Sequence, residues 1–263
     1  MKPKSPKHRA IVAGNEMPEP LFYAISDIHG CHELLERLWL RIECDALRLL
    51  APGAKATVVF LGDYIDRGPD SVGVVEWCAR LQRRPPPWCA PVFLLGNHEQ
   101  MMFDFLETRD KEGLGFWVEN GGGATLDSLE IGAGTPKQIA ALLFRAGEQR
   151  GLLKWFLTLR FHHRAAGYLF VHAGIEPGVA LAKQDPMECL WIREEFLDSS
   201  EDHGFRVVHG HTPTSSGCVE VLANRVNVDT GACYSGVLSA VRLRGKDVGI
   251  LQVKAPATRR GKR

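Results

Sequence analysis

TVVFLGDYIDRGPD, residues 57–70, joins a run of apolar β-forming residues to a loop that holds three carboxylates, one arginine and two glycines. Continuous apolar runs of this length, bounded by turn residues, are typical of strands buried on both faces of a sheet. A helical pattern of apolar residues follows over residues 72–81. The stretch therefore predicts a strand, a charged loop and a helix in succession.

The same succession occurs on both sides of this stretch. LFYAIS, residues 21–26, precedes DIHG, and leucines at helical spacing follow over residues 32–42. VFLL, residues 92–95, precedes GNHE, and a helical pattern follows over residues 100–106. Because strand–helix alternation is typical of a mostly parallel sheet that binds ligands beyond the carboxyl ends of its strands, we expect the three charged loops to meet.

The segment from about residue 107 to 160 is interpreted as a helical insertion or cap. It contains helical patches at residues 138–144 and 152–159, and a glycine run at residues 121–123. That run matches neither G-x-G-x-x-G nor a P-loop, so it favours a flexible turn.

From residue 168 onward the strand pattern returns, in YLFVHAG, FRVVHGHTP, RVNVDTG, SGVLSAVRLR and DVGILQV. The last three alternate as antiparallel strands do. We expect an α/β fold in which two mixed β-sheets pack as a sandwich flanked by helices. Residues 20–254 are expected to form a single domain.

Composition narrows the class of protein. The 263 residues include 32 basic and 31 acidic side chains, so the net charge is +1. The overall charge of the protein therefore does not favour binding to nucleic acid or to a membrane. The residues at 1–19 and 255–263 are expected to be disordered basic tails. No signal-peptide core or membrane-length apolar run occurs, and the seven scattered cysteines favour reduced thiols, so a cytoplasmic location is expected.

Oxygen and imidazole side chains gather at the ends of the predicted strands. Such mixed ligands from separate strands suit a pair of divalent metal ions, with a central carboxylate bridging both. Several imidazoles favour Mn, Fe or Zn over Mg or Ca, and the absence of cysteine argues against a thiolate zinc site. DIHG alone could equally be a helix-capping turn, but the ordered recurrence of such motifs favours metal binding. The candidates are Asp27, His29, Asp63, Asn97, His98, His172, His209 and His211.

Five motifs in this order resemble the phosphoprotein phosphatase family of dinuclear metallophosphoesterases, over about residues 21–242. They are D-x-H-G, G-D-x-x-D-R-G, G-N-H-E, V-H-A-G and H-G-H-T, beginning at residues 27, 62, 96, 171 and 209. GNHEQMM most resembles the bacterial and phage branch, which includes the lambda phage serine/threonine protein phosphatase.

The resemblance implies which side chains hold each ion. Asp27, His29 and Asp63 would bind the first ion, and Asp63 would bridge to the second. Asn97, His172 and His211 would complete the second site, with Mn as the expected metal and Fe or Zn as alternatives. The family pattern favours His211 over His209. Since these two lie at i and i+2, an extended strand would send both to the same side, where His209 would support a ligand from behind.

The remaining charged residues suit hydrolysis of a phosphate ester. Two cations lower the pKa of a water molecule between them and place a hydroxide in line with phosphorus. Arg67 is expected to bind the phosphoryl oxygens, because its fork matches two oxygens at once. The family resemblance makes Arg193 the second candidate for binding these oxygens. Alternatively, Arg193 lies on a surface helix and pairs with a glutamate. His98, held protonated by Asp66, would donate a proton to the leaving alkoxide.

The leading hypothesis is a serine/threonine protein phosphatase that acts on a phosphorylated protein or peptide, with no nucleic-acid or membrane partner and no prediction of oligomeric state. The alternative is a symmetrical diadenosine tetraphosphate hydrolase. Such relatives usually lack the acid at Asp66 and have G-N-H-D where this chain has Glu99. The motif that corresponds to HGHT has the form G-H-x-H in nucleases of the wider superfamily. Here Pro213 occupies its last position, which argues against nuclease activity.

A non-catalytic binding protein is a further alternative, but it would not need Arg67 and His98 beside a complete ligand set. Asp70, without another role, is expected to cap a helix.

Overall fold

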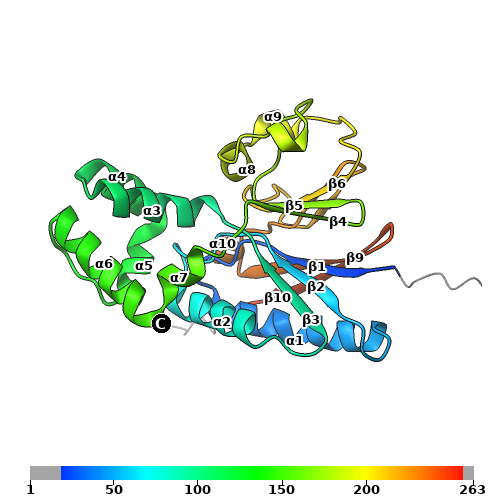
Figure 1. Ribbon diagram of the computed structural model, residues 1–263, viewed down its shortest axis with the longest axis horizontal. Helices are drawn as coiled ribbons and strands as arrows, with labels where there is room; N and C mark the ends of the chain where they lie inside the picture. The colour runs from blue at the N-terminus through cyan, green and yellow to red at the C-terminus, as the bar shows by residue number, and fades with distance from the viewer. Residues whose placement is uncertain (1–18, 257–263) are drawn as a thin grey trace, which may run out of the picture.

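The computed structural model describes residues 19–256 and consists of two five-stranded sheets stacked between helices (Figure 1). The predicted basic tails lie outside the described residues, apart from Glu19, Ala255 and Pro256. None of the helices in the described part is both long and apolar enough to cross a bilayer.

The first sheet has the strand order β10-β9-β1-β2-β3. Its parallel half is formed by β1 (Leu21–Ile25), β2 (Ala56–Phe60) and β3 (Cys89–Phe93). The antiparallel half is formed by β9 (Val237–Arg244) and β10 (Asp247–Lys254). Helices α1 (His32–Leu49) and α2 (Ser71–Arg83) cover the outer face of this sheet (Figure 1).

The second sheet has the order β4-β5-β6-β8-β7. Strands β5 (Tyr168–Val171), β6 (Arg206–His209) and β8 (Arg225–Asn227) are parallel, while β4 (His162–Ala165) and β7 (Glu220–Val221) pair antiparallel at the two edges. RVNV, which was expected to form an antiparallel strand, pairs antiparallel with β7 but parallel with β6. The chain reverses through β7 before it enters β8, so β8 runs parallel to β6. Three short elements lie outside this sheet: η2 (Leu181–Lys183), α8 (Glu188–Trp191) and α9 (Glu194–Leu197).

Alternating side chains of β1 build two separate hydrophobic cores. Tyr23 and Ile25 pack in the core beneath α1 and α2, while Phe22 and Ala24 face the second sheet. There the Phe22 ring lies 5.5 Å from that of Phe170. Apolar side chains on both faces of one strand explain its continuous hydrophobic run. The predicted sandwich of two mixed sheets flanked by helices is confirmed.

Helix boundaries differ from the sequence pattern where capping decides them. Helix α3 (Asn97–Thr108) begins inside the GNHE motif, not after it, because the Glu99 carboxylate accepts the N–H of Gly96 at 3.0 Å. Asp70 caps α2 by accepting the N–H of Gly73 at 2.7 Å, which confirms its predicted role. Strand β3 tolerates Pro91 because it lies at a sheet edge.

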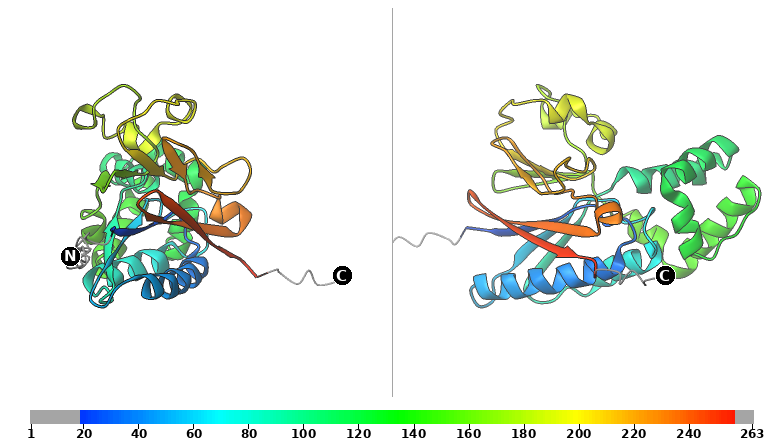
Figure 2. Two further views of the ribbon diagram at one scale, coloured as in Figure 1. Left: turned by 90° about the vertical axis from the view of Figure 1, so that its right-hand side faces the viewer. Right: turned by 180° about the vertical axis from the view of Figure 1, so that it is seen from behind.

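The segment between α3 and β4 is helical and projects to one side of the sandwich, as the view from behind in Figure 2 shows. The glycine run in it lies at a kink between two helical elements, where Gly121 has a φ of 109°. A Cβ on Gly121 would come within 2.6 Å of Arg67 Cγ, and one on Gly122 within 2.5 Å of the Trp117 ring. These glycines therefore permit close packing. The elements are α4 (Lys111–Trp117), η1 (Val118–Gly122), α5 (Gly123–Ser128), α6 (Pro136–Arg150) and α7 (Leu152–Phe156).

Candidate metal centre

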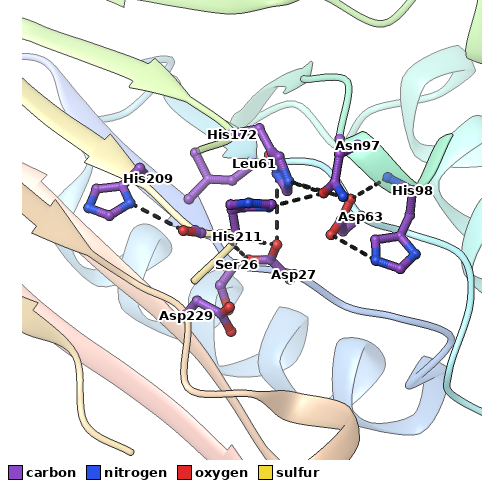
Figure 3. Close-up of polar contacts among 12 residues, drawn as sticks. Ser26, Asp27, Leu61, Asp63, Asn97, His98, His172, His209, His211 and Asp229 are labelled. Carbon is purple, nitrogen blue, oxygen red and sulfur yellow. Dashed lines mark hydrogen bonds and ion pairs between the residues drawn. The ribbon is translucent and has the colours of Figure 1, made fainter. Parts of the chain in front are cut away.

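Buried polar side chains meet where β1, β2 and β3 of the first sheet and β5 and β6 of the second sheet end (Figure 3). All come from the motif loops that follow these strands, as the sequence predicts for parallel strands. Each is at most 6% exposed: Asp27, His29, Asp63, Asn97, His98, His172 and His211.

Asp63 lies at the centre of this cluster. Its Oδ2 is 3.4 Å from His29 Nε2 and 3.9 Å from His98 Nε2. Its Oδ1 is 3.5 Å from His172 Nε2. Two groups of coordinating atoms, each within 4.8 Å, therefore share this one carboxylate: His29, Asp63 and His98 on one side, and Asp63, His172 and His211 on the other.

Two backbone carbonyls set the tautomers of the flanking histidines. His29 Nδ1 lies 2.8 Å from the Ile65 carbonyl oxygen, and His172 Nδ1 lies 2.8 Å from that of Leu61. Burial lowers the pKa of both rings, that of His172 to about 3, so they are neutral. Since a carbonyl only accepts, Nδ1 carries the proton and each Nε2 turns a lone pair toward an oxygen of Asp63.

Acceptor atoms that converge in this way fit divalent cations. Asn97 Oδ1 also lies 2.9 Å from His172 Nε2 and 3.0 Å from His211 Nδ1. The buried His211 Nε2 has no hydrogen-bond partner among the described residues. A cation on each side of Asp63 would satisfy these acceptor atoms, including the unpartnered His211 Nε2.

Asp27 is oriented differently from the other predicted ligands. Its two oxygens accept the backbone N–H of His211 at 3.0 and 3.1 Å, and it belongs to neither group. Burial raises its pKa, and so does the charge of Asp229, which is 2% exposed. Asp229 is not among the residues predicted from the sequence. It follows the RVNV run, so the rule that selected the other strand-end carboxylates would have found it.

Backbone strain is concentrated in the cluster. In the described part of the chain, eight non-glycine residues have positive φ, and five of them come from the motif loops. Such conformations cost on the order of 1 kcal/mol each and persist only where the surrounding structure imposes them. The five are His29 (44°), Asp63 (54°), Asp66 (72°), Arg67 (65°) and His211 (67°).

His209 does not point to the same side as His211, so that expectation is wrong. Strand β6 ends at His209, and the left-handed backbone of His211 turns the two side chains apart (Figure 3). The His209 ring instead lies edge-on to Phe196, with centroids 5.1 Å apart, and its Nδ1 is 3.2 Å from the Gly210 carbonyl oxygen.

His98 and Asp66 form a buried pair beside the cluster. His98 Nδ1 lies 2.7 Å from Asp66 Oδ2, and the two side chains are 2% and 0% exposed. Burial raises the pKa of Asp66 to about 7. Burial, followed by the charges of Arg67 and Arg193, lowers the pKa of His98 to about 2.

The two predicted arginines both lie close enough to His98 to lower its pKa. Arg67 Nη1 donates to His29 Nε2 at 2.7 Å, and its guanidinium lies 5.6 Å from the centre of the Tyr234 ring. Tyr234 belongs to the short helix α10 (Ala232–Ser235) and is 70% exposed. Arg193 precedes α9 and donates to Thr212 Oγ1 at 3.0 Å, not to a glutamate.

Comparison with known proteins places this arrangement in a family. Residues 20–238 match the family of calcineurin-like phosphoesterases. The chain belongs to the calcineurin-like phosphoesterase family. This calcineurin-like phosphoesterase is thus a phosphate-ester hydrolase, and its family uses divalent metals. The resemblance to metallophosphoesterases that the sequence motifs indicate is confirmed.

Relatives of this calcineurin-like phosphoesterase differ in their named substrates. It is 31% identical over 229 residues to serine/threonine-protein phosphatase 1 of Salmonella typhimurium, covering 84% of this chain and 91% of the relative. It is 24% identical over 242 residues to the asymmetrical bis(5'-nucleosyl)-tetraphosphatase PrpE of Oceanobacillus iheyensis, covering 85% and 88%. A Saccharomyces cerevisiae serine/threonine phosphatase similar to human PP5 has the same fold, with a TM-score of 0.56, 15% identity and coverage of 94% and 83%.

Proposed function

We propose that this calcineurin-like phosphoesterase removes phosphate from serine or threonine side chains of proteins or peptides. The observation that carries the proposal is the buried pair of His98 and Asp66, 2.7 Å apart, on the rim of the candidate metal centre. The alkoxide of serine or threonine is a poor leaving group, so its departure is accelerated by a positioned acid. A leaving group that is stable as an anion would not require this pair.

The proposed ligand sets follow the two sides of Asp63. Asp27, His29 and Asp63 would hold one ion, and Asp63, Asn97, His172 and His211 the other. The mixture of oxygen and imidazole donors favours Mn, with Fe or Zn as alternatives. When bound, such ions supply an activated water as nucleophile and draw negative charge from the phosphoryl oxygens.

The chain's own side chains would bind the substrate phosphate. Arg67 and Arg193 each offer a planar fork of N–H donors, which matches two phosphoryl oxygens. Arg67 donates to His29 Nε2 at 2.7 Å and must leave that nitrogen to reach the phosphate. Because Arg67 lies in the same loop as Asp63, its backbone is fixed relative to the proposed nucleophile.

His98 would donate its proton to the leaving oxygen, with Asp66 orienting the ring. Since burial lowers the pKa of His98 to about 2, Asp66 alone does not hold the ring protonated. The negative charge of a bound phosphate dianion would favour the imidazolium beside Asp66. His98, expected from the sequence to be held protonated by Asp66, would therefore be protonated in the substrate complex.

A second candidate activity is hydrolysis of diadenosine tetraphosphate, because two classes of relative carry such names. Two residues favour the protein phosphatase over the symmetrical hydrolase. Asp66 is present and contacts His98. Glu99, in place of the aspartate of those relatives, accepts backbone N–H groups of Asp63 at 3.0 Å and Tyr64 at 2.8 Å.

The deciding experiment supplies the protein and Mn²⁺ with a phosphoserine peptide and, separately, with diadenosine tetraphosphate. The proposal expects release of inorganic phosphate from the peptide with a kcat/KM at least about tenfold above that for the dinucleotide. Faster conversion of the dinucleotide to ADP, or to ATP and AMP, would establish the second candidate. Absence of metal-dependent release of p-nitrophenol from its phosphate ester would indicate a non-catalytic binding protein.

A further inference from the structure

The Asp66 carboxylate accepts hydrogen bonds from two helices of the segment between α3 and β4. Trp117 Nε1, at the end of α4, lies 2.9 Å from Asp66 Oδ2. Thr125 Oγ1, in α5, lies 2.6 Å from Asp66 Oδ1. All three side chains are at most 3% exposed, so water does not compete for these bonds. Together with His98, the donors engage both oxygens of the carboxylate.

The same segment, together with Ser71 of α2, also holds the backbone of the loop. The N–H of Asp66 donates to Thr125 Oγ1 at 2.9 Å and to Ser71 Oγ at 3.0 Å. The N–H of Arg67 donates to the Gly121 carbonyl oxygen at 3.1 Å. Asp66 and Arg67 both have positive φ, which is unfavourable for residues with a Cβ. The helical segment therefore stabilises a conformation that the loop would not adopt alone.

The donors themselves are rigidly placed. The Trp117 ring stacks on Phe105, with centroids 5.8 Å apart and an interplanar angle of 23°. Gly122 also approaches this ring so closely that a Cβ would lie 2.5 Å from it. Hydrogen bonds from Trp117 and Thr125 to different oxygens oppose rotation of the carboxylate, which keeps Oδ2 directed at His98 Nδ1.

We propose that Trp117 and Thr125 are positioning residues, which orient Asp66 and through it the His98 ring toward the leaving oxygen of the substrate. The inference rests on the proposed function, in which His98 protonates that oxygen. If it holds, the helical segment contributes to the reaction rate by orienting the acid. The effect should appear in the step that depends on leaving-group protonation, and not in phosphate binding.

The test uses two variants. Trp117→Phe keeps an aromatic ring and removes the indole N–H, while Thr125→Val keeps the branched shape and removes the hydroxyl that donates to Asp66 Oδ1 and accepts the Asp66 N–H. Each is assayed with Mn²⁺ on a phosphoserine peptide and on p-nitrophenyl phosphate, whose anion leaves without a proton. The expected loss of kcat is roughly tenfold or more on the peptide and less than about threefold on the aryl ester, with KM unchanged within about twofold.

Two controls separate positioning from general stability. Trp155→Phe removes a buried indole N–H that has no hydrogen-bond partner among the described residues, so both activities should stay at the wild-type level. Thr125→Ser keeps the hydroxyl and should restore the peptide activity lost in Thr125→Val. Circular dichroism melting curves establish that each variant is folded, and the Thr125 pair suffices if Trp117→Phe does not fold.

A double-mutant cycle gives the sharpest outcome. In a His98→Asn background, Trp117→Phe should cause no further loss on the peptide, because its effect passes through His98. Additive losses in the double mutant would overturn the inference. So would single variants that lose the two activities equally, or that lose neither. None of these outcomes would affect the phosphatase activity of the wild-type protein. If the wild-type protein cleaves neither substrate, the proposed function fails and this inference fails with it.

Discussion

Gly210→Ala should weaken metal binding without altering the fold. Gly210 separates His209 from His211 and has a φ outside the left-handed region, so alanine is compatible with its backbone. However, a Cβ at this position would lie 2.1 Å from Asp27 Oδ2. Non-bonded carbon and oxygen atoms rarely approach closer than about 3 Å, so the carboxylate must move by roughly 1 Å.

The size of the effect follows from the bonds that Asp27 would lose. Its oxygens accept the N–H of His211 at 3.0 and 3.1 Å, and a hydrogen bond to a charged group contributes about 1.5–3 kcal/mol. Since about 1.4 kcal/mol corresponds to a tenfold change in affinity, the Kd of the ion that Asp27 is proposed to bind should rise roughly 10- to 150-fold.

Isothermal titration with Mn²⁺ measures this change, and Gly132→Ala is the matched control. A Cβ added to Gly132 would meet no atom within 4 Å, and the φ of this residue is not left-handed, so its substitution should leave Mn²⁺ affinity at the wild-type level. A Gly210→Ala protein that melts like wild type and binds Mn²⁺ within about twofold of wild type would refute the assignment of Asp27 as a ligand.

Three further outcomes test the site and its support. His98→Asn should slow hydrolysis of an alkyl phosphate roughly 10²- to 10⁴-fold and an activated aryl phosphate far less; equal losses would remove the acid role. Saturating Mn²⁺ should raise the Tm of the chelator-treated protein by roughly 10 °C in differential scanning fluorimetry, and a similar rise in Asp63→Asn would contradict the bridging role. Asp70→Ala removes the 2.7 Å bond to Gly73 N and should lower the Tm by about 2–4 °C with unchanged kcat; an unaltered Tm would show that the cap is dispensable.

Much of the fold followed from periodicity and turn chemistry. The apolar runs before DIHG, GDYIDRG and GNHE became three neighbouring parallel strands, because residues buried on both faces must be apolar throughout. The hydrophobic pattern did not determine whether strands of the second sheet pair parallel or antiparallel. β8 reads as an alternating strand whether its neighbour is parallel or antiparallel, and only the reversal at β7 decided the outcome.

The sequence by itself determined most of the side chains that meet at the candidate metal centre, although not Asp229, because strand ends and residue chemistry are local properties. Only the tertiary structure decided how they are directed: that Asp27 faces the backbone of His211, that His209 turns to Phe196, and that Trp117 and Thr125 hold Asp66. These contacts join residues far apart in the chain. Their geometry depends on positive φ angles and close packing that are imposed by the folded surroundings, and no pattern of residue types records them.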